Sequence, residues 1–290
     1  MCLDNVCPKF FTVILNYNGE VFTDNCLAAL NKINYLNHTI IVIDDCSKSN
    51  EIINVVNKYP GVLFRRNAKN LNYCKSFNRG INMALSRGAE YVFVVNNDTK
   101  GFSSNFITSV IEEFKSDSNV GIVGTECYDF DGRVLRNETG SIRFGFNMVV
   151  PTEGYVLSRK ALETVGGFNE KLVIYMEDLD LLKRLEIANY KFGFAKKAKF
   201  EHYCGATTSS ARFKLTFMRS RNICLFARHY LKELPKKEML KQIIKNAGSP
   251  IKTALSEFSK GHLVSPTKRI LAVVIGLMVG LIMDTKKIFK

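Results

Sequence analysis

The stretch YVFVVNNDT, residues 91–99, decides which fold this sequence predicts. Tyr91 to Val95 are β-branched or aromatic residues, a composition typical of a strand buried on both faces of a sheet. Asn96, Asn97 and Asp98 follow directly, and these side chains could not continue a buried strand without an uncompensated desolvation cost. The chain therefore reaches the edge of the sheet at Asn96, and this edge carries polar side chains.

Upstream of this stretch, short apolar strands alternate with helical segments. The strands are expected at residues 10–15, 39–43 and 62–64, and the helices around residues 25–30 and 75–85. Such alternation predicts a mainly parallel central sheet flanked by helices on both faces. The predicted class is therefore α/β, and ligands of such sheets bind at the carboxyl ends of the strands.

Polar segments follow three of the predicted strands: NYNG at 16–19, DDCS at 44–47 and NND at 96–98. Each segment alone could be an ordinary turn, because Asn, Asp, Ser and Gly are the usual turn residues. The carboxyl ends of parallel strands meet at one edge of the sheet, however. Their convergence favours a binding site over three unrelated turns.

A second polar cluster lies in YMEDLDLLKRLEIANYKFGFA, residues 175–195. The leucine spacing predicts a helix whose first turn carries Glu177, Asp178 and Asp180. Acidic residues there could simply stabilise the helix N-terminus through its dipole. Three carboxylates within four positions exceed that need, and their mutual repulsion requires a cation, a hydrogen-bond donor or protonation of one member.

Charge is distributed unevenly along the 290 residues. Residues 1–180 hold 18 Lys and Arg against 21 Asp and Glu, whereas residues 181–290 hold 23 against 6. The basic half indicates a polyanionic partner, which could be nucleic acid, anionic lipid headgroups or a phosphorylated substrate; the alternative is a solvated basic surface. The eight cysteines show no zinc-site spacing and are expected to be reduced thiols. No secretory signal is recognisable, so we expect a cytoplasmic location.

The C-terminal region contains an apolar run, residues 270–283, without one polar side chain. As a helix this run would reach about 21 Å, which is short of the roughly 30 Å hydrocarbon core of a bilayer. The basic flanks suit a helix lying at an anionic membrane surface; they are Lys268, Arg269, Lys286 and Lys287. Gly276 and Gly280 could instead pack on a neighbouring helix, and a buried C-terminal helix remains the soluble alternative.

The strand-end residues and the acidic cluster together indicate one kind of chemistry. A divalent cation that has few protein ligands and completes its shell with substrate phosphates fits Asp98 and its asparagine neighbours. Such a metal neutralises a leaving diphosphate, while a separate carboxylate with a raised pKa deprotonates an attacking hydroxyl. The sequence therefore predicts transfer from a nucleotide-activated donor to an alcohol.

Six segments occur in an order that resembles a known family: VILNYNG, IVIDDCS, NLNYCKSFNRG, VVNNDT, EGYVLSRKALETVGGFNE and MEDLDLLKRLEIANYKFGFAKKAKFEHYCGATTS. The sequence resembles glycosyltransferase family 2 with the GT-A fold, in particular its rhamnosyltransferase-like branch. The resemblance covers about residues 10–210. It implies a GT-A catalytic domain at 1–210, with a nucleotide-binding part at about 9–100 and an acceptor part at about 101–210. A basic helical region, 211–290, follows.

The resemblance also implies roles for individual residues. Asp98 would be the principal ligand of a Mn or Mg ion, in the place of the family's DxD motif, and His202 would complete the metal or diphosphate site. Asp178 would be the catalytic base of the family's ED pair, beside Glu177 and Asp180. The residues implied to bind the nucleotide sugar are Asn16, Tyr17, Asn18, Asp44, Asp45, Asn70, Lys75, Asn78, Asn96 and Asn97.

Two positions depart from the family's pattern. Asn96 stands where DxD has its first Asp, which lowers the negative charge beside the metal. Asn72 stands where glycine is usual, a tolerable change because Asn adopts positive φ more readily than most residues.

The expected function is inverting transfer of a sugar to a glycan acceptor that is linked to lipid, at the inner face of a bacterial-type cell membrane. A nucleotide-dependent oxidoreductase is disfavoured because no GxGxxG follows the first strand. A nucleic-acid-binding protein would leave the NND and MEDLD segments unexplained, so nucleic acid is not an expected partner. A catalytically inactive family member that acts as a scaffold stays an alternative, and self-association stays open.

Overall fold

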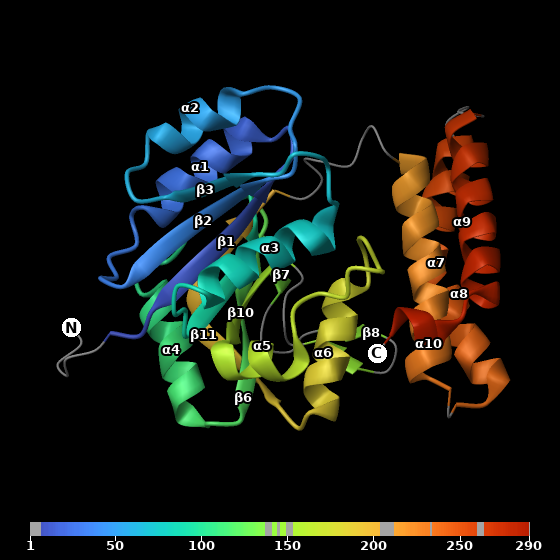
Figure 1. Cartoon of the computed structure of the whole chain (residues 1–290). Helices are drawn as coiled ribbons and strands as arrows, with labels where there is room; N and C mark the ends of the chain where they lie inside the picture. Colours follow the sequence, from blue (N-terminus) through green and yellow to red (C-terminus); the bar gives the residue numbers. More distant parts are fainter. Residues whose placement is uncertain are drawn as a thin grey trace. The chain divides into compact units, whose positions relative to one another are not determined.

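The computed structural model describes residues 7–136, 141–143, 146–148, 153–203, 212–232, 234–259 and 264–289 (Figure 1). The chain forms two compact units. The first comprises residues 1–142, 147–168 and 181–206, and the second comprises 143–146, 169–180 and 207–290. The second unit thus includes the segment 169–180, which the sequence places in the acceptor part of the catalytic domain.

The first unit is built on a sheet with the strand order β3-β2-β1-β4-β10-β6-β11-β5, to which β7 adds by pairing with β6. Its strands are β1 Phe10–Asn16, β2 His38–Asp44, β3 Leu63–Arg66, β4 Tyr91–Asn96, β5 Thr99–Lys100, β6 Val120–Tyr128, β7 Val134–Arg136, β10 Gly154–Ser158 and β11 Lys191–His202. Its helices are α1 Glu20–Leu30, α2 Glu51–Asn57, α3 Tyr73–Leu85, α4 Phe106–Ser116 and α5 Arg159–Val165. Two short strands, β8 Ser141–Arg143 and β9 Phe146–Met148, pair with each other.

The predicted α/β class is confirmed, and the sheet is mixed. Strands β3, β2, β1 and β4 are parallel, as the alternation of strands and helices predicts. Strand β10 then runs antiparallel to both of its neighbours, β4 and β6, while β6 and β11 are parallel. The half of the sheet formed by β3, β2, β1 and β4 therefore has the expected parallel topology, and the antiparallel strand enters only beyond β4.

In the first unit, helices pack closely on the sheet around a core of buried apolar side chains (Figure 1). Phe10, Ile14, Phe93 and Phe200 are completely buried. On the α3 side, Gly80 lies so close to Val13 that a β-carbon at this position would overlap the valine side chain. The glycine therefore lets α3 settle directly on β1, which fixes the loop that precedes α3 near the strand ends.

The second unit consists mainly of helices: α7 Arg212–Tyr230, α8 Lys236–Ser259, α9 Val264–Ile282 and α10 Thr285–Ile288. Helix α9 packs so closely on α7 that a β-carbon added at Gly280 would lie 2.7 Å from the Arg221 carbonyl oxygen. None of the helices among the described residues combines the length and the apolarity that crossing a bilayer requires.

The described cysteines are free thiols, in agreement with the sequence prediction. They are Cys7, Cys26, Cys46, Cys74, Cys127 and Cys224. Cys2 and Cys204 lie outside the described residues.

Candidate active site

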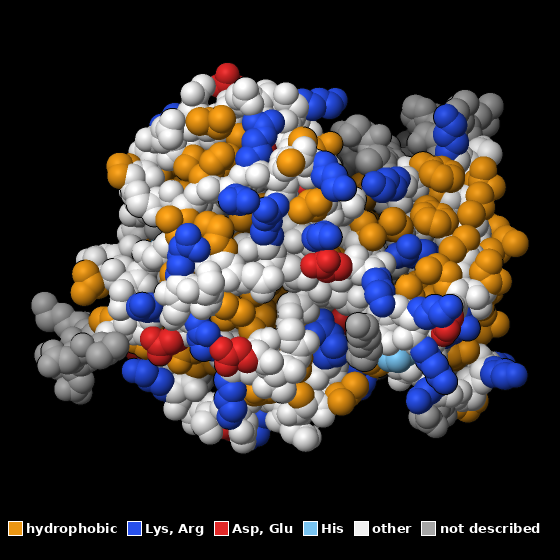
Figure 2. Space-filling model, viewed as in Figure 1, with side chains coloured by type: hydrophobic (Ala, Val, Ile, Leu, Met, Phe, Trp, Pro, Cys, Tyr) orange, Lys and Arg blue, Asp and Glu red, His pale blue; other side chains and the backbone are white. Residues whose placement is uncertain are grey.

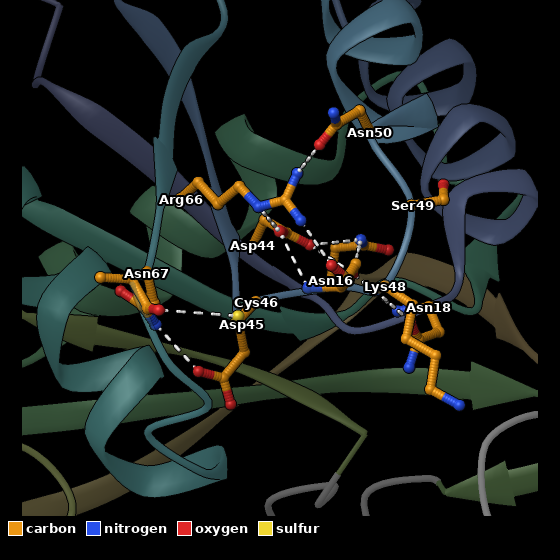
Figure 3. Close-up of polar contacts among 12 residues, drawn as sticks. Asn16, Asn18, Asp44, Asp45, Cys46, Lys48, Ser49, Asn50, Arg66 and Asn67 are labelled. Carbon is orange, nitrogen blue, oxygen red and sulfur yellow. Dashed lines mark hydrogen bonds and ion pairs between the residues drawn. The ribbon is translucent and has the colours of Figure 1, made fainter.

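The carboxyl ends of β1, β2 and β4 meet at one edge of the sheet, as predicted. The register pairs Asn16 with Asp44 across β1 and β2, and Leu15 with Asn96 across β1 and β4. The polar segments that follow these strands therefore begin at the same level of the sheet. Figure 3 shows the side chains after β1 and β2 joined by hydrogen bonds to each other and to residues at the end of β3.

Asn16 and Asp44 form the buried centre of this network (Figure 3). Asn16 Nδ2 donates to Asp44 Oδ1 at 2.8 Å and to Ser47 Oγ at 3.1 Å. The other carboxylate oxygen of Asp44 lies 3.2 Å from Arg66 Nε and accepts a hydrogen bond from the Ser47 amide. Both oxygens of Asp44 thus contact protein groups, so this carboxylate holds the loop after β2 and does not line an open surface.

Asp45 belongs to a different set of contacts. Its Oδ1 accepts hydrogen bonds from Asn67 Nδ2 at 2.9 Å and from the Leu71 amide at 2.7 Å, and Figure 3 shows its carboxylate on the side of the loop away from that of Asp44. No residue that the structure describes donates a hydrogen bond to Asp45 Oδ2. Of the two aspartates, Asp45 is therefore the one with an acceptor left for a ligand.

Asn97 links the end of β4 to the start of α1. Its Nδ2 donates to Thr23 Oγ1 at 3.0 Å and to the Gly19 carbonyl at 3.2 Å, and its side chain is buried. A β-carbon at Gly19 would lie 2.8 Å from this nitrogen. Asn97 is thus a buried positioning residue, and it fixes the turn that carries Asp98.

Asp98 and His202 lie side by side at the same edge. His202 ends β11 and pairs in register with Thr99, and its Nε2 lies 3.1 Å from Asp98 Oδ1. Both side chains are largely buried. No described residue, however, makes a hydrogen bond of acceptable geometry to Asp98 Oδ1. A buried carboxylate oxygen in this condition loses its hydration without full compensation, which points to a ligand group that is bound in the working protein.

The acidic cluster opens α6, Glu177–Ile187, whose first residues belong to the second unit. Burial, followed by the charge of Asp178, raises the pKa of Glu177 to about 8. Asp180 is completely buried and accepts a hydrogen bond from the Tyr230 hydroxyl at 2.7 Å. Asp178 is partly exposed. Among these three carboxylates, Asp178 is therefore the one that reaches the surface.

The backbone before this cluster is strained and is held by one side chain of α7. Val173, Tyr175 and Met176 all have positive φ, between 67° and 71°, a region in which β-branched and bulky residues are outliers. Asn222 is completely buried, and its Nδ2 lies 2.8 to 2.9 Å from the carbonyl oxygens of Leu172, Ile174 and Tyr175. Asn222 therefore fixes the conformation of the backbone that leads into α6. The sequence offered no signal for it, because this contact joins residues almost fifty positions apart.

The family model that describes glycosyl transferase family 2 matches residues 12–165. These residues include every strand end described above except that of β11. The chain belongs to glycosyltransferase family 2. A search of the curated proteins finds no match to this chain.

Solved structures of glycosyltransferases share the fold of this family member. S. aureus TarS 1–349 in complex with UDP-GlcNAc is 14% identical over 93% of this chain and 81% of that chain, with a TM-score of 0.66. TarS 1–349 by itself covers 97% of this chain and 83% of its own length, at 14% identity and a TM-score of 0.63. The mannosyltransferase PcManGT from Pyrobaculum calidifontis, in complex with GDP-Man and Mn2+, is 13% identical over 95% of this chain and 86% of that chain, with a TM-score of 0.58. The GT-A fold of this glycosyltransferase is thereby established.

Among the other residues implied by the family resemblance, some are accessible. Tyr17 is 44% exposed, and Asn18, Asn70 and Lys75 are exposed as well. Tyr17 and Asn18 lie in the loop after β1, Asn70 lies in the loop before α3, and Lys75 lies in the first turn of α3.

Two further residues of that set contact the protein itself. The Asn78 side chain forms hydrogen bonds of 2.8 and 2.7 Å with the backbone of Phe168. Asn96 accepts a hydrogen bond from the Tyr73 hydroxyl at 3.2 Å. Asn78 thus secures α3 to the segment after α5, while Asn96 joins the end of β4 to the start of α3.

Sequence reasoning missed Arg66 and Asn67. Arg66 balances the buried charge of Asp44, and Asn67 positions Asp45. Both stand at the carboxyl end of β3. The rule that identified the other strand ends would have found them, had it been applied to the strand expected at residues 62–64.

Proposed function

We propose that this glycosyltransferase moves a sugar, with inversion of the anomeric centre, from a nucleotide-diphosphate sugar to a hydroxyl of a lipid-linked glycan acceptor. The buried Asp98 Oδ1 at the end of β4, which receives no hydrogen bond from any described residue, carries the proposal. This atom lies beside His202, at the edge where the nucleotide-binding strands end. The process served is bacterial-type surface polysaccharide synthesis.

Asp98 and His202 would hold a divalent metal, Mn or Mg. Among the described residues no three His, Cys, Asp or Glu side chains gather into a metal site. A two-ligand site fits a hard cation that takes its remaining ligands from substrate phosphates and water, and the oxygen of Asp98 without a hydrogen bond supports this fit. When bound, the metal neutralises the charge that develops on the leaving diphosphate.

The nucleotide is proposed to lie against the loops after β1 and β2. Asp45 would accept a hydrogen bond from the base or ribose through Oδ2, the oxygen that no described residue contacts. The exposed ring of Tyr17 is available to pack on the base. Asn16, Asp44 and Asn97 act from behind this surface, because they are buried and satisfied by protein partners. Asn18, Asn70, Lys75, Asn78 and Asn96 would border the donor.

Asp178 is proposed as the base that deprotonates the acceptor hydroxyl. It is the accessible member of the acidic cluster, and Glu177 and Asp180 beside it are buried. Glu177, whose pKa is raised to about 8, keeps its proton at neutral pH and so is not available as the base. A single base and a single leaving group suffice for one in-line displacement, which inverts the anomeric centre.

The test is a donor-hydrolysis screen with GDP-mannose, UDP-N-acetylglucosamine and dTDP-rhamnose, each with and without Mn2+ or Mg2+. We expect one donor to be hydrolysed, and the rate to fall to background when EDTA removes the metal. Absence of hydrolysis, together with no thermal stabilisation by any nucleoside diphosphate plus Mn2+, would favour the inactive scaffold. Stabilisation by DNA or RNA alone would favour a nucleic-acid-binding protein.

A further inference from the structure

Helix α9 presents an apolar face that no described residue of its own unit covers. Its buried positions include Ala272, Val273, Gly276 and Gly280, and the two glycines contact α7. From residue 271 to residue 282 the opposite face carries large hydrophobic side chains: Leu271, Val274, Ile275, Met278, Leu281 and Ile282, which are between 37% and 82% exposed. At 3.6 residues per turn these six side chains fall within about 120° of the helix circumference.

The sequence posed packing on a neighbouring helix and exposure to a membrane as alternatives for this run. In the structure, the contact with α7 and an exposed apolar surface lie on opposite faces of one helix. The small residues let α9 approach α7, and the large residues point outward. Figure 2 shows hydrophobic side chains gathered over this part of the chain, with Lys and Arg gathered below them.

Helix α8 contacts α9 and repeats the pattern with a row of lysines. Leu240, Ile244, Ile251 and Leu255 are between 36% and 60% exposed and fall within about 60° of the helix circumference. Lys241, Lys245 and Lys252 are exposed and share one strip about 90° further round. An apolar stripe bordered by lysines is the pattern of a helix that lies at the interface of an anionic membrane.

We propose that the exposed faces of α8 and α9 form a membrane-docking surface for anionic phospholipid. The apolar side chains enter the boundary between headgroups and acyl chains, and the lysines of α8 contact the headgroups. Lys268, at the start of α9, and Lys286 and Lys287, beyond its end, are exposed and add to this charge.

A second copy of the chain fits this surface less well than a membrane. Residues 207–290 hold 17 Lys and Arg against 4 Asp and Glu. Two such surfaces brought face to face would place rows of like charge together, which opposes association. Anionic lipid complements the same rows, and it also accepts apolar side chains of any shape. The positive charge of this surface therefore favours an anionic membrane over a second copy of the chain.

The experiment measures sedimentation of the full-length protein with vesicles of phosphatidylglycerol and phosphatidylcholine in equal amounts. Deleting α9 would be uninformative, because its glycine face packs on α7. One variant instead combines Lys241→Gln, Lys245→Gln and Lys252→Gln, and a second combines Ile244→Gln, Leu255→Gln, Leu271→Gln and Met278→Gln. All these positions are exposed, so the unfolding temperature should stay unchanged.

We expect the wild type to bind these vesicles and to bind pure phosphatidylcholine more weakly. The lysine variant should lose roughly 100-fold in partition coefficient, since each basic residue at such a surface contributes about fivefold and three are removed. High salt should weaken the wild type more than the lysine variant, which keeps only Lys268, Lys286 and Lys287 of the lysines named for this surface, because salt screens only the charge contribution. The apolar variant should fail to sediment at any salt concentration.

Matched controls test whether the position of these residues matters. Lys32→Gln, Lys115→Gln and Lys160→Gln remove the same charge from exposed positions of the first unit. Leu36→Gln and Ile187→Gln replace hydrophobic side chains that are 91% and 64% exposed. Both controls should bind like the wild type. Equal losses in the controls, or no binding by the wild type, would overturn the proposal. So would a dimer in analytical ultracentrifugation that the apolar variant converts to a monomer while vesicle binding is absent.

Docking on a membrane would bring the enzyme to a lipid-linked acceptor, and this part of the inference rests on the proposed function. Vesicle binding is measured without donor, and donor hydrolysis without vesicles, so each proposal can fail alone. If both hold, the apolar variant should retain donor hydrolysis and lose transfer to a lipid-linked acceptor in vesicles.

Discussion

Each unit of this glycosyltransferase departs from the usual distribution, in which polar side chains are exposed and apolar side chains are buried. The first unit buries polar groups at its sheet edge, among them Asn16, Asp44, Asn97 and Asp98. The second unit exposes large hydrophobic side chains along α8 and α9. Buried polar groups cost free energy unless they are paired, and exposed apolar surface costs free energy unless it is covered. Each departure therefore marks a place where another molecule is expected.

The two departures differ in how completely the protein satisfies them. At the sheet edge, Asn16, Asp44 and Asn97 have protein partners, whereas Asp98 Oδ1 is buried and receives no hydrogen bond from any described residue. Along α8 and α9, no described part of the unit covers the apolar stripes. A site for a small ligand needs one unoccupied contact position that rigid neighbours hold in place. A surface that docks on a fluid membrane needs a broad apolar area and no fixed geometry.

Replacing the carboxylate of Asp98 should have the largest effect on activity. Asp98→Ala is expected to lower kcat/KM by about 10⁴, because metal stabilisation of a leaving group contributes several kcal/mol. The unfolding temperature should stay the same or rise, since a buried oxygen without a hydrogen bond is removed. Glu112→Ala, at an exposed position, is the control. Retention of full, metal-dependent activity by Asp98→Ala would show that the metal is held elsewhere.

Asp178→Asn should reduce kcat by roughly 10² to 10⁴, the usual contribution of a general base. Donor hydrolysis by water and the KM for the donor should change much less, because the acceptor hydroxyl is the group that needs the base. Steady-state kinetics with donor and acceptor varied separately measures both. Loss of donor binding with normal turnover would instead identify Asp178 as a ligand.

Asn222→Ala tests whether the second unit supports the chemistry. Three carbonyl oxygens would lose a donor, so we expect a fall of about 10-fold to 100-fold in kcat with an unchanged donor KM. Stability should fall by roughly 1–3 kcal/mol.

Ser220→Ala is the matched control for Asn222→Ala, because Ser220 is also completely buried on α7 and its hydroxyl has no hydrogen bond to any described residue. An equal loss of kcat in the control would mean that general loosening of the helix, and not the held backbone before α6, explains the effect.

The smallest expected effect concerns pH. Glu177 has a pKa near 8 in the folded chain against an ordinary value of 4.5, so the folded state keeps a proton that the unfolded state releases in this interval. The free energy of unfolding should therefore fall as pH rises from about 5 to 8. Glu177→Gln should match the wild type at pH 5 and be more stable than it at pH 9, because the amide has no proton to release. Chemical denaturation at both pH values measures the difference, and parallel pH profiles would contradict it.

Local sequence patterns correctly predicted the positions of β1, β2, β3 and β4 and of helices α1 and α3 in the first unit. Buried strands followed by polar residues identified the sheet edge, since this signal needs only neighbouring residues and the periodicity of a strand. The same reasoning found the acidic start of α6 and the unusual apolar run at residues 270–283. It missed the stripe of α8, whose apolar residues are separated by four to seven positions, so that no continuous run drew attention.

The sequence by itself determined the α/β class, the edge at which ligands approach and the basic character of the C-terminal half, because strand periodicity and charge are local properties of the chain. Only the tertiary structure decided that Asp44 turns toward Arg66 while Asp45 keeps an oxygen free of described partners, and that Asn222 holds the backbone before Glu177. It also decided which face of α9 meets α7. These outcomes depend on contacts between residues far apart in the sequence, and the energy of such contacts exists only once the elements have packed.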